Sequence, residues 1–116
     1  MQTALYQVTD EAITKDRAIE ITRTLKQRFN NEIDPYAQVF LFGSTVKNES
    51  RPWSDIDVAI VSDRFKGLNS SEDTPLYALL TYQIYSLIEV HTYNHQQWNA
   101  SNRFIEEIKD TGVEIK

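Results

Sequence analysis

Two aspartates on alternate positions, Asp55 and Asp57, stand where an apolar run begins at residues 58–61. Alternate side chains of a β-strand project from the same face, so the two carboxylates should lie close together. Carboxylates held this close repel each other unless a cation lies between them, and Mg²⁺ prefers hard oxygen ligands and binds phosphates as well. The pair can also be two surface acids at the start of a strand, although Asp is unfavourable inside strands. The pattern therefore indicates a site for a metal and a nucleoside triphosphate.

A small-residue turn, Gly43-Ser44, follows the apolar run at 40–42 and lies ten residues ahead of the first acid. Glycine lets a backbone N–H approach a phosphate oxygen, a serine hydroxyl adds a donor, and a helical turn behind them adds partial positive charge. The same pair can form an ordinary tight turn, so its weight comes from its position between a strand and the acids. Lys47 can reach a phosphate or remain a solvated charge, and Asn48 tolerates a left-handed turn.

A third acid, Glu89, lies within an apolar run between Ile88 and Val90. An acid in such a place is costly without a role, so Glu89 can be a third carboxylate that binds a metal or takes a proton from an attacking hydroxyl. The alternative is an outward-facing glutamate on a half-exposed sheet. His91 shares the face of Glu89, but a single histidine is more often structural, so we treat it as peripheral.

Hydrophobic periodicity and the positions of Thr, Pro and Gly predict alternating helices and strands. The expected elements are a helix at 9–30 capped by Thr9, strands at 36–42, 56–61 and 86–93, a helix capped by Thr74 with Pro75 at its first position, and a last helix capped by Ser101 and ended at Gly112. Residues 45–48 should form a helical turn, and the tail at 113–116 can add a strand. The polar residues 62–73 predict a mobile loop.

This order predicts an α/β (α+β) fold with a small mixed β-sheet flanked by helices. The first two strands are separated by one turn, and the helix between the second and third strands favours a crossover to a parallel neighbour. The aromatic residues expected in the core are Tyr36, Tyr77, Tyr82, Tyr85 and Phe104. Trp53 and Trp98 can be partly exposed and stack on a base or a partner, or simply pack.

Composition limits the class of protein. The 116 residues suit one domain, 1–116, with 41% hydrophobic and 25% charged residues. The absence of cysteine excludes zinc fingers, redox motifs and disulfide scaffolds. No apolar run approaches a membrane span and no signal peptide is visible, so we expect a cytoplasmic protein without a membrane partner. The net charge of −5 argues against stable nucleic-acid binding, but not against a single nucleotide held through a metal.

The Gly43-Ser44 turn followed by Asp55-Ile56-Asp57 resembles the signature of the DNA polymerase β-like nucleotidyltransferase superfamily. The short chain without an appended domain is similar to the minimal nucleotidyltransferase (MNT) proteins. The resemblance extends over most of the chain, because it includes the late acidic strand at 87–90 and the end of the last helix at 108–113.

This resemblance implies a nucleotidyltransferase fold and a set of roles. Gly43, Ser44 and Lys47 would hold the triphosphate, Asp55 and Asp57 would bind two Mg²⁺ ions, and Glu89 would complete the metal site and act as base. An acceptor hydroxyl would attack the α-phosphate of ATP, with pyrophosphate leaving. Family members of this size are commonly antitoxins that transfer AMP to a tyrosine of a partner HEPN ribonuclease toxin.

Three positions depart from the family pattern, and two other functions stay open. Lys47 and Asn48 stand where the family often has Arg and Gly, and a lysine is a point charge rather than a planar fork. Glu89 stands where the family often has Asp. One alternative is transfer to a small molecule such as an aminoglycoside, although such enzymes usually carry a further domain. The other is a non-catalytic antitoxin that covers its partner and keeps its carboxylates to sense a nucleotide.

Overall fold

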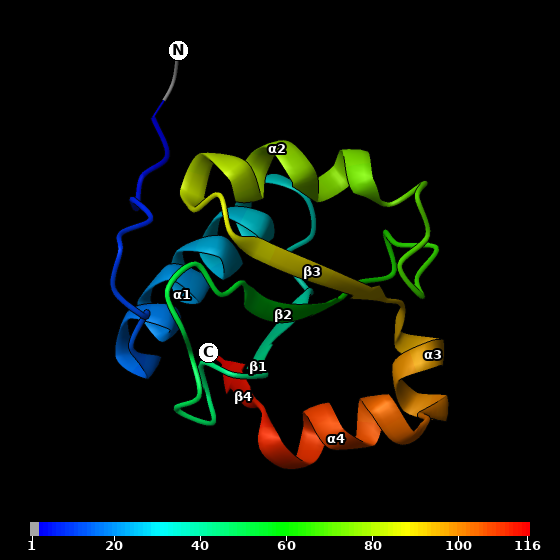
Figure 1. The fold of residues 1–116 in the computed structure, drawn as a ribbon. Helices are drawn as coiled ribbons and strands as arrows, with labels where there is room; N and C mark the ends of the chain where they lie inside the picture. Colours follow the sequence, from blue (N-terminus) through cyan, green and yellow to red (C-terminus); the bar gives the residue numbers. More distant parts are fainter. Residues whose placement is uncertain (1–2) are drawn as a thin grey trace.

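A mixed β-sheet forms the centre of the computed structural model, which describes residues 3–116 (Figure 1). In chain order the elements are α1 (Lys15–Glu32), β1 (Gln38–Phe42), β2 (Ile56–Val61), α2 (Thr74–Ile84), β3 (Ile88–Tyr93), α3 (His95–Ala100), α4 (Arg103–Thr111) and β4 (Val113–Ile115). The four strands of this part of the chain lie in the order β3-β2-β1-β4. β1 runs antiparallel to β2 and β4, whereas β2 and β3 are parallel. The expected mixed sheet flanked by helices, with a crossover helix between β2 and β3, is confirmed.

The two faces of the sheet are covered by different helices, as Figure 1 shows. The α1/α2 side holds the larger core, in which Val58 and Ile60 of β2 are fully buried together with Phe29 of α1. On the α3/α4 side, Ala59 and Val61 of β2 belong to a second core with Trp98, Tyr93, Ile105 and Ile108. Because side chains alternate along a strand, Asp57 points to this second side.

The first helix begins later than the sequence predicts, at Lys15 and not near Thr9. Residues 3–14 are not helical, and the N–H groups of Leu5 and Tyr6 donate to carbonyls at the end of α2. Thr14 caps α1, because its hydroxyl accepts a hydrogen bond of 3.1 Å from the N–H of Arg17. The helix therefore begins after the Thr14 cap, later than the sequence pattern predicts.

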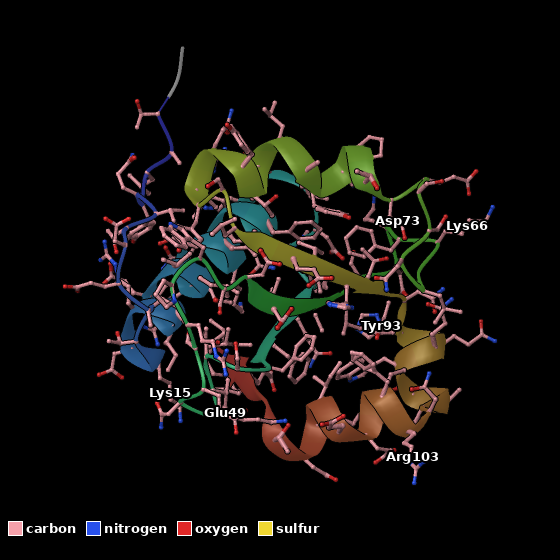
Figure 2. All side chains as sticks on the ribbon, viewed as in Figure 1. Lys15, Glu49, Lys66, Asp73, Tyr93 and Arg103 are labelled. Atoms are coloured by element: carbon pink, nitrogen blue, oxygen red, sulfur yellow. The ribbon has the colours of Figure 1, made fainter. Side chains whose placement is uncertain are left out.

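The segment at 62–73, expected to be mobile, is tied down by the buried carboxylate of Asp73. That carboxylate accepts hydrogen bonds of 2.7 Å from the N–H groups of Lys66 and Gly67, and one of 3.0 Å from the hydroxyl of Thr92. Figure 2 labels Asp73 and Lys66 in this loop, near the end of β3. Asp73, not Thr74, is the N-cap residue of α2, and its side chain makes no capping bond. The loop follows the end of β2 that lies away from Asp57.

The segment after β3 contains a helix, α3, that periodicity did not predict. Its start is fixed by a capping box in which Asn94 and Gln97 exchange hydrogen bonds with each other's backbone. Ser101, expected as the cap of the last helix, instead ends α3 with φ +64°, and Asn102 caps α4. The tail forms β4 against β1. None of the helices within residues 3–116 has both the length and the apolar character needed to cross a bilayer.

Phe29 should be among the side chains on which stability depends most. It is fully buried in α1, and its ring centroid lies 5.6 Å from that of Phe65. Phe29→Ala should lower the free energy of unfolding by about 3–5 kcal/mol through lost burial and an unfilled cavity. Urea unfolding measures this as a lower midpoint at unchanged slope. Leu79→Ala, on an α2 residue that is 69% exposed, is the control and should cost under about 0.5 kcal/mol; equal losses in both variants would contradict this description of the core.

Candidate active site

Two of the predicted acids meet across the parallel pair of strands. Asp57 of β2 lies opposite Glu89 of β3, and Ala59 lies opposite His91. Ligand atoms of Asp57, Glu89 and His91 all lie within 4.8 Å of one another. Asp57 is half-buried, whereas Glu89 is exposed. The arrangement is a cluster of oxygen and nitrogen donors that is open to solvent on the side of Glu89.

The glycine of the Gly43-Ser44 turn lies directly against Asp57. Phe42, the last residue of β1, pairs with Asp57 in the sheet, and Gly43 follows with φ +82°. A Cβ added at position 43 would collide with the carboxylate oxygen Oδ2 of Asp57. Glycine is therefore required twice here, by the left-handed backbone and by the closeness of the acid.

The chain makes a short helical turn after Gly43, as expected from the sequence. The carbonyl of Gly43 accepts from the N–H groups of Val46 and Lys47 at 3.1 and 3.2 Å, and the carbonyl of Ser44 accepts from Glu49 at 2.9 Å. Asn48 ends the turn in the left-handed region, with φ +58°. These bonds use the carbonyls of Gly43 and Ser44, so the turn holds its first residues in a fixed conformation beside Asp57.

Asp55 and Lys47 lie outside the cluster of three donors. Asp55 is exposed and precedes β2 by one residue, yet its charge still acts on Asp57. The Lys47 ammonium lies 3.5 Å from the carboxylate of Glu107 on α4, at the surface. Both Lys47 and Glu107 line a cavity of about 160 Å³ next to Gly43. Lys47 is therefore beside the glycine turn, and its side chain is paired with an acid.

The electrostatics of the cluster show an excess of negative charge. Burial raises the pKa of Asp57 from 3.8 to about 7, and hydrogen bonding with Glu89 and the charges of Glu89 and Asp55 add to this effect. Burial lowers the pKa of His91, which favours a neutral imidazole able to bind a metal. An added cation would favour the ionised form of Asp57, so the site has the charge and the donor types that a divalent metal needs.

The raised pKa of Asp57 predicts how metal-free stability depends on pH. In the unfolded chain this group loses its proton near pH 3.8, whereas in the folded protein it keeps the proton up to about pH 7. The folded state therefore binds the extra proton between these values, and the stabilisation it provides is lost as pH rises from about 4 to about 7. Urea unfolding in chelator, compared at the two ends of this window, should show the loss in wild type. If the free energy of unfolding of Asp57→Asn fell with pH as steeply as that of wild type, Asp57 would not be the group responsible.

His91 and Phe104 are the residues near the site that the sequence underestimated. His91, which the sequence predicts to be peripheral, belongs to the donor cluster, and its position two residues after Glu89 on the same strand is the signal that could have identified it. Phe104 was expected in the core but is 43% exposed, as are Tyr36 and Tyr82 to larger extents. Tyr85 and Trp98 are buried. Hydrophobic periodicity predicts which face of a helix or strand a residue lies on. It does not predict whether another element covers that face at that residue, so these aromatic residues could not be assigned as exposed.

Comparisons with known proteins agree with this geometry. The family model described as "Polymerase beta, Nucleotidyltransferase" matches residues 20–116. A crystal structure of a candidate nucleotidyltransferase from Sulfolobus solfataricus has the same fold, with a TM-score of 0.61 and 14% sequence identity over 86% of this chain and 80% of that chain. A search of curated proteins found no match. Since the family model covers most of the sequence and both acidic strands, the chain belongs to the polymerase beta family of nucleotidyltransferases.

Proposed function

We propose that this protein is a Mg²⁺-dependent nucleotidyltransferase that transfers AMP from ATP to a tyrosine hydroxyl of a partner HEPN ribonuclease toxin, and so acts as an antitoxin. The observation that carries the transferase reaction is the contact of Gly43 with Asp57, which itself lies beside Glu89. ATP and the HEPN partner are supported by the resemblance to minimal nucleotidyltransferases. An ATP donor fits a cytoplasmic location.

The residues of the cluster fit a divalent metal. Asp57 and Glu89 offer hard oxygen donors, and burial, together with the neighbouring carboxylates of Glu89 and Asp55, raises the pKa of Asp57 to about 7. Asp55, Asp57 and Glu89 would hold two Mg²⁺ ions, and His91 offers a nitrogen donor in the same cluster. When bound, Mg²⁺ would neutralise charge on the triphosphate and polarise its oxygens.

The chain's own groups would position the reactants and move one proton. The turn at Gly43 and Ser44 would orient the triphosphate, and the Lys47 ammonium could turn from Glu107 to a phosphate oxygen. The acceptor oxygen forms a bond to the α-phosphorus while the bond from that phosphorus to the bridging oxygen breaks, and pyrophosphate leaves with the electron pair. Glu89, which is exposed and beside Asp57, accepts the proton of the attacking hydroxyl.

Transfer of label tests this proposal. Wild type and Asp57→Asn are incubated with [α-³²P]ATP and Mg²⁺, first with a lysate of the source organism and then with the purified acceptor. Asp63→Asn is the matched control, because Asp63 is an exposed acid paired with His95 at the far end of β2. We expect a labelled protein with wild type and Asp63→Asn only, with the label on a tyrosine of a HEPN protein.

Other results would change the assignment. Label on a small molecule would indicate a small-molecule nucleotidyltransferase. Neutralisation of the toxin by Asp57→Asn at wild-type strength would indicate a nucleotide-sensing antitoxin that acts by binding. Label on a protein that is not a HEPN toxin would support nucleotide transfer to a protein but would identify a different acceptor.

A further inference from the structure

Three aromatic rings border the acidic cluster on the side of α4. The ring of Phe104 lies 5.8 Å from that of Phe42 and 5.5 Å from that of His91, and Phe42 and His91 are 5.1 Å apart. His91 belongs to the donor cluster, and Phe42 pairs with Asp57 in the sheet. Phe104 therefore lies at the edge of the site. Its ring contacts those of Phe42 and His91, while 43% of its surface remains exposed.

The exposed ring is not explained by packing of α4. The residues by which α4 fills the second core are Ile105 and Ile108, both almost fully buried. Phe42 contacts the Phe104 ring edge-on and His91 contacts it at a tilt, and these two contacts restrict its movement, so a flat ligand could stack on it at little cost in side-chain entropy. An exposed, immobilised aromatic ring next to a polar site is a typical stacking surface.

A cavity connects this ring to the glycine turn. Its volume is about 160 Å³, and Phe104 and Phe42 line it together with Gly43, Lys47 and Glu107. One part of the lining is therefore aromatic, and another is the turn and the ammonium that would face phosphates. A molecule with a flat ring and a phosphate chain has matching chemistry for this cavity.

We propose that Phe104 is the stacking platform for the base of the bound nucleotide, in the cavity that Phe104 shares with Gly43 and Lys47. This inference rests on the proposed function and specifies how the donor nucleotide is held there. Base stacking on a single ring tolerates different bases, so this platform supplies affinity for a nucleoside more than a choice between bases.

The strand order favours the nucleotide over the acceptor as the occupant. The sheet order β3-β2-β1-β4 puts Asp57 between Gly43, at the end of β1, and Glu89, on the edge strand β3. The cavity is on the side of Gly43, whereas the proton acceptor Glu89 is exposed at the other side. A nucleotide in the cavity leaves the Glu89 side open for the attacking hydroxyl.

Calorimetric titration of the full-length protein with ATP and with inorganic tripolyphosphate, both in Mg²⁺, tests the platform. Tripolyphosphate carries the phosphates without the base. Phe104→Ala should weaken ATP binding by about 5- to 100-fold and leave tripolyphosphate binding within about twofold of wild type. Phe104→Tyr, which keeps the ring, should bind ATP like wild type, and Leu79→Ala on the exposed face of α2 is the control for an unrelated apolar deletion. Circular dichroism checks that each variant is folded.

Three outcomes would overturn the inference. If Phe104→Ala binds ATP with wild-type affinity but transfers AMP more slowly, the ring serves the acceptor and not the base. If Phe104→Ala loses tripolyphosphate and ATP affinity equally, the ring supports the phosphate site through packing. If wild type binds neither ATP nor tripolyphosphate, the proposed function fails together with the stacking role of Phe104. This outcome can be told apart from failure of the stacking role alone, because it is seen in wild type without any substitution.

Discussion

Asp57→Asn is expected to lower the rate of nucleotide transfer by about a thousandfold or more, the largest effect of any single substitution in the site. Asp57 is the only one of the three predicted acids that lies beside both Gly43 and Glu89 in the part of the chain described. An amide keeps the shape of the side chain but cannot supply the negative charge that a metal requires. Steady-state release of pyrophosphate with saturating ATP and acceptor measures the change.

The same substitution should not unfold the protein. In the absence of metal, the ionised Asp57 carboxylate is disfavoured in the fold, as its pKa of about 7 indicates. Asn removes that charge, so Asp57→Asn should be at least as stable as wild type above pH 7. Asp63→Asn should keep nearly full activity, because Asp63 lies beyond the other end of β2. An active Asp57→Asn protein, or one that is inactive only because it is unfolded, would contradict this role.

Gly43→Ala is expected to lower the transfer rate by about a hundredfold, through displacement of the Asp57 carboxylate and not through loss of a reacting group. The new Cβ would occupy the space of the carboxylate oxygen Oδ2 of Asp57, so the carboxylate or the turn must shift. The alanine must also adopt φ near +82°, which should cost about 1–2 kcal/mol of stability. Transfer kinetics and urea unfolding of the same preparation separate the two effects.

Gly67→Ala is the control for a strained glycine substitution away from the acids. Gly67 has φ +91°, and a Cβ there would collide with the side chain of Gln97 of α3. Gly67→Ala should therefore lose at least as much stability as Gly43→Ala and retain activity. If both glycine variants lose activity in proportion to stability, the contact of Gly43 with Asp57 has no special part in the reaction.

Local sequence patterns predicted the elements that form the acidic site. β2 begins and ends where its apolar run predicts, and the crossover through α2 follows from the helix between two apolar strands. The turn after Gly43 and the left-handed Asn48 are set by two or three neighbouring residues. These features depend on interactions within a few residues, which a single sequence displays directly.

The remaining features depend on contacts between distant segments. Leu5 and Tyr6, ahead of α1, bond to carbonyls at the end of α2, and the loop at 62–73 is fixed by Asp73 reaching Thr92 on β3. The inclusion of His91 in the donor cluster needs the register of β2 against β3. The exposure of Phe104 depends on where the α4 layer stops over the sheet, which no local pattern displays.

The parallel register of β2 and β3 places Asp57 beside Glu89, and this register is fixed by apolar side chains on the other face of the sheet. Ile88 and Val90 flank Glu89 and pack on the α1/α2 core, opposite Ile56 and Val58. A slip of β3 by one residue would bury Glu89 in that core and expose two apolar side chains, so the hydrophobic layer rejects it. The distance between the carboxylates is thus maintained by residues that never touch a substrate. An insertion in the short connection from α2 to β3 that shifts this register should consequently lower stability and activity together.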